Sequence, residues 1–429
     1  MDKFVIEGPT PLKGTIPISG SKNAALPLMA AAILGDSPTT ITNIPKLRDI
    51  YTFNNVIRVT GTRVDFDEDE GTLTIDSANL CHKEAPYELV RKMRASFYML
   101  GALLGKFGEA KVSLPGGCAW GPRPVDLHLN GMREMGAEIK LEKGYVIAKA
   151  PKMMKGGTFT LEPSSVGATV NLVLASVLRA KEFTLKNAAK EPDVVLLCKK
   201  LAKMGADIDG IGTDTLTIRA VDKLQGVEIR NAADRIETGT FMIAAAMHPE
   251  SEIALTGVDV DDLGTFPKAF KKTGAEVTIE DSSIHIKAPK QINPASVKTK
   301  VYPGFPTDLQ AQWSTMMTQA AGDSSVTDTI YFDRFSYVPE VVRLGADLEV
   351  KKNAVHIKGK TPLKGASVMS TDLRASVSLV LAGMAAEGTT EVLRIYHLDR
   401  GYEDLEEKLS AVGAKIKRID QDEEVGSEK

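Results

Sequence analysis

The hydrophobic and polar positions follow one pattern that recurs along the chain. An apolar helical segment is followed by a helix that ends at a glycine, and then by two short strands in which apolar and polar residues alternate. Clear copies of the helix end and strand pair are "MREMGAEIKLEKGYVIAKA", "FKKTGAEVTIEDSSIHIKA" and "VVRLGADLEVKKNAVHIKG". Alternation of this kind is typical of strands with one buried face. The pattern predicts a chain built from repeated modules of helices and strands.

One glycine marks the end of this helix in each of six copies. The marker glycines are Gly61, Gly136, Gly205, Gly274, Gly345 and Gly413. They lie about 70 residues apart, which is too far for the common solenoid repeats and suits a small βαβαββ module. We expect each of them in the left-handed conformation, because that way of ending a helix is favourable only without a Cβ.

A further helix in each copy is apolar nearly all round, which predicts that it is buried. These segments comprise residues 23–34, 94–107, 167–180, 238–247, 308–322 and 373–388. Six modules sort most simply into two globular halves of three, each of the size expected for a domain. The sequence therefore predicts an α/β protein of two domains, each with three βαβαββ repeats.

The chain start indicates how the two halves are connected. The segment "TPLKGTIPISGSKN" at 10–23 echoes "TPLKGASVMSTDLR" at 361–374. We therefore expect the chain to cross between the halves twice, near 19–22 and near 231–234. One domain would comprise 22–232, and the other 1–21 together with 233–419. The charged residues 420–429 would form a solvated tail.

Composition excludes several classes of protein. The formal net charge of the 429 residues is −3, which gives no reason to expect binding to nucleic acid or to an acidic membrane. The start resembles no secretory signal and the apolar stretch 24–34 is too short to span a bilayer, so we expect a cytoplasmic protein without membrane insertion. Three cysteines without metal-ligand spacing, and six scattered histidines including His128, indicate neither a disulfide framework nor a metal site.

Charged and small polar residues gather where the apolar helices begin. They are Lys22, Asn23, Arg94, Ser165, Gly167, Asp234, Asp308, Asp372 and Arg374. A helix N-terminus favours anions, so these positions are candidates for binding phosphate or carboxylate groups. The alternative for each is a solvated surface residue or, for Asp308, a helix N-cap.

The loop "LPGGCAWGPRPVDLH" carries the most unusual chemistry, because its glycines and prolines predict an exposed position for Cys118. The alternative for Cys118 is an exposed thiol without a function. Arg123 follows in the same loop, and Arg334 and Arg400 occupy corresponding loops of the fifth and sixth copies. Arginine binds phosphate and carboxylate in bidentate fashion, which points to a substrate with both groups. Asp308 could act there as a general base.

Together, several motifs along the chain resemble those of one known enzyme family. With SKN, MRAS, the cysteine loop, FPTD and DRGYE in this order, the chain from Asp2 to about Ile419 resembles the UDP-N-acetylglucosamine 1-carboxyvinyltransferases, enolpyruvyl transferases of peptidoglycan synthesis. The loop departs from the usual small or aliphatic residues of that family at Trp120 and Pro122. The resemblance implies two inside-out α/β barrels with threefold pseudosymmetry. It also implies transfer of the enolpyruvyl group of phosphoenolpyruvate to the 3′-hydroxyl of UDP-N-acetylglucosamine, with release of phosphate and without a cofactor.

The resemblance also assigns residues. Phosphoenolpyruvate would be bound by Lys22, Asn23, Arg123, Arg334, Arg374 and Arg400. The sugar nucleotide would be bound by Arg94, Arg123, Pro124, Val125, Asp126, Leu127, Ser165, Val166, Gly167, Asp308 and Ile330. Cys118 would be the proton donor and Asp308 the general base, with Lys22 and Arg400 also catalytic. The alternatives are enolpyruvyl transfer to shikimate phosphate and a non-catalytic repeat protein that binds anions.

Overall fold

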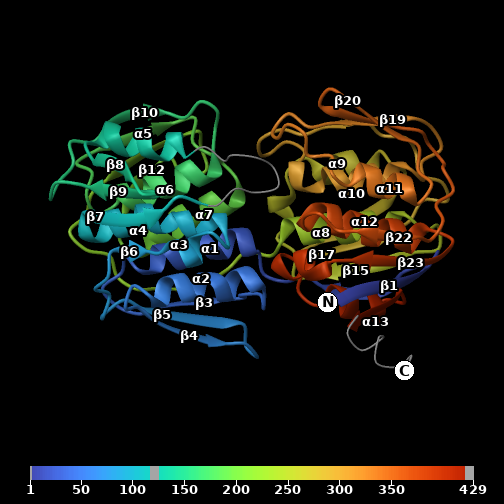
Figure 1. The fold of residues 1–429 in the computed structure, drawn as a ribbon, viewed down its shortest axis with the longest axis horizontal. Coiled ribbons are helices and arrows are strands. Elements are labelled where there is room, and N and C mark those ends of the chain that lie inside the picture. Colours follow the sequence, from blue (N-terminus) through green and yellow to red (C-terminus); the bar gives the residue numbers. More distant parts are fainter. Residues whose placement is uncertain (1, 116–124, 421–429) are drawn as a thin grey trace. The chain divides into compact units, whose positions relative to one another are not determined.

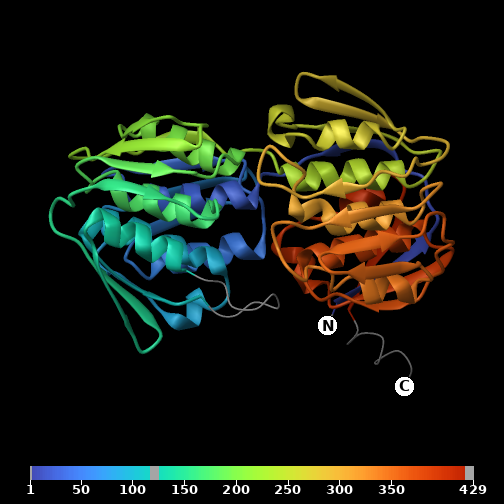
Figure 2. The same cartoon turned by 90° about the horizontal axis from the view of Figure 1, so that it is seen from above.

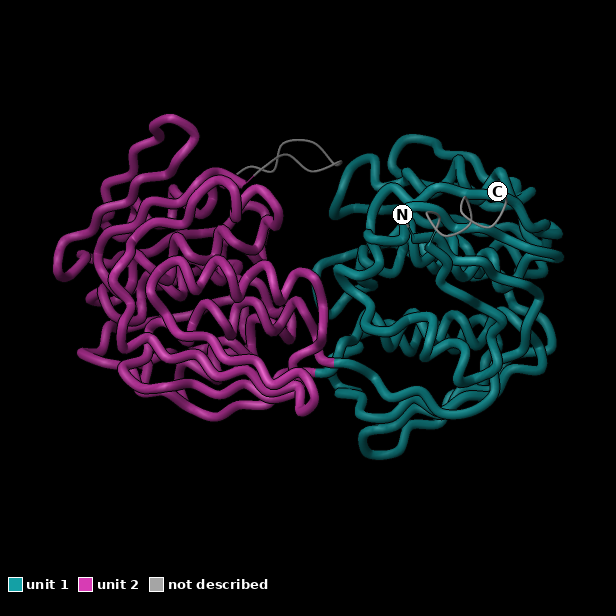
Figure 3. Tube along the Cα trace, turned by 60° about the horizontal axis from the view of Figure 1, so that its bottom comes forward, with its two compact units in different colours: residues 1–19, 233–429 teal, residues 20–232 magenta. Residues whose placement is uncertain are grey.

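The computed structural model describes residues 2–115 and 125–420. The chain divides into two compact units, one comprising 20–232 and the other 1–19 together with 233–429 (Figure 3).

The unit 20–232 contains three four-stranded sheets, ordered β14-β3-β5-β4, β6-β7-β9-β8 and β10-β11-β13-β12. In each sheet the first two strands are parallel and the other pairs antiparallel. The strands are β3 (Thr39–Thr42), β4 (Arg63–Asp67), β5 (Thr72–Asp76), β6 (Glu84–Ala85), β7 (Glu109–Ser113), β8 (Glu138–Glu142), β9 (Tyr145–Lys149), β10 (Gly157–Thr160), β11 (Phe183–Lys186), β12 (Asp207–Asp209), β13 (Thr215–Arg219) and β14 (Glu228–Arg230).

Its apolar helices lie inside, enclosed by the sheets (Figures 1 and 2). They are α1 (Lys22–Ala32), α4 (Tyr98–Phe107) and α6 (Val166–Ser176). Amphipathic helices α2 (Arg48–Arg58), α5 (Asp126–Met135) and α7 (Pro192–Lys203) pack around them, with the short α3 (Tyr87–Val90) and the 3-10 helix η1 (Arg94–Phe97) leading into α4. The expected helix at 94–107 is thus a 3-10 turn followed by an α-helix.

The other unit repeats this plan, with sheets ordered β16-β17-β15-β2, β18-β19-β21-β20 and β22-β23-β1-β24. The strands are β1 (Asp2–Gly8), β2 (Lys13–Pro17), β15 (Glu252–Thr256), β16 (Glu276–Glu280), β17 (Ser283–Lys287), β18 (Val297–Lys298), β19 (Ser324–Thr327), β20 (Leu348–Lys351), β21 (Ala354–Ile357), β22 (Ser367–Met369), β23 (Gly388–Leu393) and β24 (Lys415–Asp420). Here β1 lies between β23 and β24, antiparallel to both, and β2 pairs in parallel with β15.

The buried helices of this unit are α8 (Arg235–Ala246), α10 (Gln310–Met317) and α12 (Leu373–Ala385). Helices α9 (Phe266–Lys271), α11 (Val338–Arg343) and α13 (Leu405–Ala411), and 3-10 helices η2 (Val260–Leu263), η3 (Thr307–Leu309) and η4 (Ile395–Arg400), complete it. The segment expected as one helix at 308–322 is shorter, because it begins as η3 and α10 ends at Met317.

The expected fold class is confirmed, and so is the role of the marker glycines. All six have positive φ between 91° and 108°. The central helices approach closely, since a Cβ built on Gly101 or Gly105 of α4 would lie 2.3 or 2.4 Å from a backbone oxygen of α6. Within the described ranges, no helix is long and apolar enough to cross a bilayer.

Candidate active site

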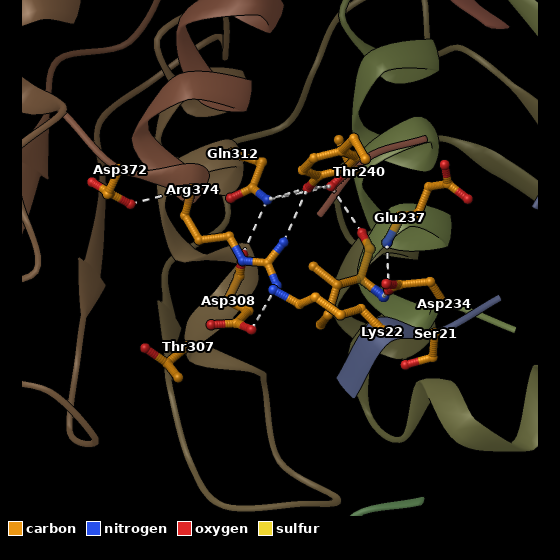
Figure 4. Close-up of polar contacts among 12 residues, drawn as sticks. Ser21, Lys22, Asp234, Glu237, Thr240, Thr307, Asp308, Gln312, Asp372 and Arg374 are labelled. Atoms are coloured by element: carbon orange, nitrogen blue, oxygen red, sulfur yellow. Dashed lines mark hydrogen bonds and ion pairs between the residues drawn. The ribbon is translucent and has the colours of Figure 1, made fainter. Parts of the chain in front are cut away.

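Asp308 lies in η3, where the central helix α10 begins, and its carboxylate is shared by two arginines. Oδ1 lies 2.8 Å from Nη2 of Arg334. Oδ2 lies 2.8 Å from Nη2 of Arg374, as Figure 4 shows. The residue at the N-cap of η3 is Pro306, and no side-chain cap bond is formed there. Asp308 therefore does not cap its helix, and its charge is balanced by guanidinium groups.

This pairing sets the charge state of Asp308. Burial by itself would raise the pKa of the carboxyl, but the charges and hydrogen bonds of Arg374 and Arg334 outweigh burial and hold the pKa well below its ordinary value. The side chain retains 26% exposure, so it is reachable from solvent. In this state Asp308 is an ionised carboxylate of low basicity.

Arg334 is held by a second contact that the sequence analysis missed. Its Nη1 donates to Oγ1 of Thr307 at 3.0 Å, and that hydroxyl donates to Oδ2 of Asp328 at 2.6 Å. Asp328 is 1% exposed and also accepts from the backbone N–H of Ile330 at 2.9 Å. Thr307 stands in the FPTD motif, whereas nothing local in the sequence singled out Asp328, because its side-chain partners are more than 20 residues away.

Arg374 in α12 is 7% exposed and faces a polar network (Figure 4). Its guanidinium lies over the ring of Tyr402, 5.9 Å from the centroid. The Tyr402 hydroxyl lies 2.9 Å from Oγ1 of Thr240, and Gln312 Nε2 donates to the same Thr240 oxygen at 3.3 Å. Arg400 ends η4, which packs against α12, and is half-buried.

The other two candidate aspartates of this unit are caps. Asp234 accepts from the N–H groups of Ile236 and Glu237 at the start of α8. Asp372 accepts from Arg374 and Ala375 at the start of α12. Equivalent positions in the three repeats thus have different tasks, and only Asp308 of these three pairs with two arginines.

In the unit 20–232, Lys22 is the first residue of α1. Its Nζ lies 2.9 Å from Oδ2 of Asp49 in α2, with side chains 12% and 5% exposed. Ser21 caps α1 by accepting from Ala24 N at 3.3 Å, and the neighbouring Asn23 is exposed. The Lys22 ammonium is therefore fixed at a helix N-terminus by a carboxylate that the sequence analysis did not identify.

The described sugar-nucleotide candidates of this unit lie where η1, α5 and α6 begin. Ser165 caps α6, Val166 and Gly167 form its first turn, and Val125 directly precedes Asp126 and Leu127 at the start of α5. A Cβ built on Gly167 would lie 3.3 Å from Cε1 of His128. Arg94 begins η1, is half-buried, and acts through its charge on the same imidazole.

The sequence analysis assigned no role to His128, although it stands in the RPVDLH run. It is 4% exposed and bonded to Asn171. Cys118, Arg123 and Pro124 lie outside the described residues. Lys22, Arg94 and the starts of α5 and α6 belong to one unit, and Asp308, Ile330, Arg334, Arg374 and Arg400 belong to the other.

Sequence comparisons show relatives over nearly the whole chain. The profile of the EPSP synthase family (3-phosphoshikimate 1-carboxyvinyltransferase) matches residues 6–409. UDP-N-acetylglucosamine 1-carboxyvinyltransferase of Chloroherpeton thalassium is 53% identical, covering 99% of this chain and 98% of the relative. The protein of the same name from Hydrogenovibrio crunogenus is 50% identical, covering 97% and 100%.

Solved structures agree. The enolpyruvyl transferase NikO from Streptomyces tendae superimposes with a TM-score of 0.89 at 25% identity, covering 97% of this chain and 99% of that one. EPSP synthase from Acinetobacter baumannii, at 19% identity and a TM-score of 0.79, covers 98% and 100% and shares the fold. The family profile matches most of the chain, and these relatives are 50% and 53% identical over nearly its full length. The chain therefore belongs to the EPSP synthase family, among its UDP-N-acetylglucosamine 1-carboxyvinyltransferases.

Proposed function

We propose that this chain transfers the enolpyruvyl group of phosphoenolpyruvate to the 3′-hydroxyl of UDP-N-acetylglucosamine and releases phosphate. The observation that carries the proposal is the 53% identity, over 99% of the chain, to a relative with that activity in its name. The cluster of Asp308, Arg334 and Arg374 supports it, because one carboxylate between two arginines offers both a base and cationic donors.

The reaction requires two proton transfers. The methylene carbon of phosphoenolpyruvate must gain a proton, and the 3′-hydroxyl of the sugar must lose one. In the proposed sequence, Cys118 protonates the methylene carbon of phosphoenolpyruvate, which leaves a cationic centre at the adjacent carbon. The sugar hydroxyl attacks that centre and gives its proton to Asp308, forming a tetrahedral ketal. The Cys118 thiolate then takes a methyl proton as phosphate leaves, which restores both the double bond and the thiol. The oxygens of phosphate and carboxylate are acceptors for Lys22 and the arginines.

Bound substrate would reconcile the low basicity of Asp308 with its proposed role as a base. Arg334 and Arg374 each use one guanidinium nitrogen on the carboxylate. A bound phosphate or substrate carboxylate competes for the same guanidinium groups, and each one withdrawn from Asp308 raises its pKa. On this ground we assign Arg334 and Arg374 to phosphoenolpyruvate. The family resemblance adds Lys22, Asn23, Arg123 and Arg400 to that proposed site. Occupation of that site would prepare Asp308 to accept a proton.

The second substrate is assigned to the other helix ends. We assign UDP-N-acetylglucosamine to Arg94, to Arg123 to Leu127 and to Ser165 to Gly167, together with Asp308 and Ile330. The N-terminus of α6 supports this assignment, because first-turn N–H groups and a positive helix end bind phosphate. Both substrates are small molecules, and we propose that the protein works in the cytoplasm.

A phosphate-release assay tests the function. Purified protein is incubated with phosphoenolpyruvate and either UDP-N-acetylglucosamine or shikimate 3-phosphate, and products are identified by mass spectrometry. We expect phosphate release and an enolpyruvyl product only with the sugar nucleotide. Release with shikimate 3-phosphate alone would support transfer to shikimate instead. Binding of both compounds without any product would support a non-catalytic anion-binding protein.

A further inference from the structure

The carboxamide of Asn171 connects three helices of the unit 20–232. Its Oδ1 accepts from the backbone N–H of Gly101 in α4 at 2.8 Å, and its Nδ2 lies 2.9 Å from Nδ1 of His128 in α5. Asn171 is fully buried in α6, so both contacts are made away from water. The orientation of the amide and the state of the imidazole are therefore linked.

These contacts fix which nitrogen of His128 carries the proton. A backbone N–H can only donate, so the atom of Asn171 that faces Gly101 must be its oxygen. The amide nitrogen then faces His128, and since it too can only donate, Nδ1 must be the acceptor. A neutral imidazole that accepts at Nδ1 carries its proton on Nε2.

The surroundings of the ring keep it neutral. Burial, and then the positive charge of Arg94, lower the pKa of His128 to about 3. Phe97 packs edge-on against the ring with 5.3 Å between centroids, which adds an apolar wall. A second proton on Nδ1 would also confront the amide N–H of Asn171. His128 thus has a single N–H donor over the physiological pH range.

That donor lies at the beginning of α6. A Cβ built on Gly167 would lie 3.5 Å from Nε2, so this edge of the ring borders the first turn of the helix. Ser165 Oγ accepts from Ala168, and the N–H groups of the preceding residues have no acceptor within the helix. His128 forms its hydrogen bond through Nδ1, and no described residue bonds to Nε2. A ring that is 4% exposed therefore holds an N–H that has no partner within the described ranges, beside a helix N-terminus.

We propose that Asn171 is a positioning residue that holds His128 as a neutral Nε2–H donor, and that this donor completes a phosphate-binding site at the start of α6. The assignment of the phosphate to the sugar nucleotide rests on the proposed function. Asn171 acts through His128 and does not touch the ligand. Because the donor does not titrate near neutral pH, its contribution to binding is constant there.

The test uses Asn171→Asp. An aspartate at this position can accept from the backbone N–H of Gly101 with one carboxylate oxygen. Its other oxygen faces His128 and can only accept, so it favours a proton on Nδ1 of the imidazole. At pH 8 the proton of His128 moves to Nδ1 and Nε2 becomes an acceptor that repels phosphate. Near pH 6 the new carboxylate favours the imidazolium, which regains the Nε2–H. The matched control is Asn130→Asp, which adds the same charge on the exposed face of α5.

Binding of UDP-N-acetylglucosamine is measured by calorimetry between pH 6 and pH 8.5. We expect Asn171→Asp to weaken binding about tenfold or more at pH 8, with part of the affinity recovered at pH 6. In turnover, KM for the sugar nucleotide rises at pH 8 while kcat changes little. Wild-type protein and Asn130→Asp should show a flat profile. Equal affinity and the same flat profile in Asn171→Asp would overturn the proposal.

The tautomer is measured separately in the unliganded wild-type protein, from the imidazole ¹⁵N shifts of His128. Protonated Nε2 and unprotonated Nδ1 from pH 6 to pH 8.5 are expected. A proton on Nδ1, or titration near pH 6.5, would refute the proposal even if Asn171→Asp failed to fold. This measurement needs no substrate, so its result does not depend on the phosphate-release assay. Failure of the wild-type protein to release phosphate would count against the proposed function only.

Discussion

Asp308 and Arg374 form an ion pair with 2.8 Å between Oδ2 and Nη2, although they are 66 residues apart in the chain. The two residues begin equivalent central helices of neighbouring repeats. In the third repeat of this unit, Asp234 stands at the same place and caps α8. The repeat supplies the position, and the residues that face it from neighbouring elements decide whether the carboxylate caps a helix or pairs with arginines.

Substitution of Asp308 separates these tasks. Asp308→Asn removes the charge and the proposed base, so we expect turnover to fall by about 10² to 10⁴. Thermal stability should also fall slightly, because Arg334 and Arg374 lose their shared counter-charge. Asp234→Asn is the stability control, since asparagine caps a helix about as well as aspartate. Turnover near wild type in Asp308→Asn would contradict a role as base.

Alkylation tests the proposed proton donor Cys118. We expect a phosphonate epoxide of the fosfomycin type to add once per chain at Cys118. Cys118→Asp should escape the reagent and keep measurable turnover, since it supplies another acid but no sulfur nucleophile. The chain contains its own controls. Cys81 is exposed, whereas burial raises the pKa of Cys198 to about 12 and so suppresses its thiolate. Peptide mass spectrometry that found the adduct on Cys81 instead would reject the assignment.

The buried side chain of Lys200 should make the folding stability depend on pH. It is fully buried in α7, its Nζ donates to the Leu28 carbonyl at 2.5 Å, and burial lowers its pKa to about 7. Between pH 7 and the ordinary lysine pKa the unfolded chain binds more protons, so this residue makes stability rise with pH over that range. Lys200→Met should remove this rise in urea unfolding at pH 7 to 9.5. The neighbouring exposed Lys199→Met should keep it.

The close packing of α4 on α6 should make the free energy of unfolding sensitive to substitution of Gly105. A Cβ on Gly105 would lie 2.4 Å from the carbonyl oxygen of Leu174, and backbone cannot yield as a side chain can. Gly105→Ala should cost about 1–3 kcal/mol of unfolding free energy. Gly144→Ala is the control, because nothing lies within 4 Å and only its φ of 79° is unfavourable, at about 1 kcal/mol. Urea unfolding that ranked the two variants in the opposite order would contradict this account of the helix contact.

The sequence predicted features that depend on neighbours along the chain. The marker glycines and the apolar helices follow from local conformation and periodicity, and both are confirmed. The pairing of Asp308 with two arginines could not be predicted, because a cap and an ion pair place the same residue at the same helix end. Asp328 and His128 were missed for a related reason. Their partners come from other elements, and neither residue departs from an ordinary local pattern.

The order in which the sheets are completed has a consequence for synthesis on the ribosome. Strand β1 is synthesised before β23 and β24, yet it lies between them in the sheet. One of its edges stays without its native partner until β23 has emerged, and the other until β24 has emerged. The unit 20–232 has all its strands once β14 is made. That unit can therefore fold while later segments are still being synthesised, whereas β1 remains unpaired until β23 and β24 have emerged.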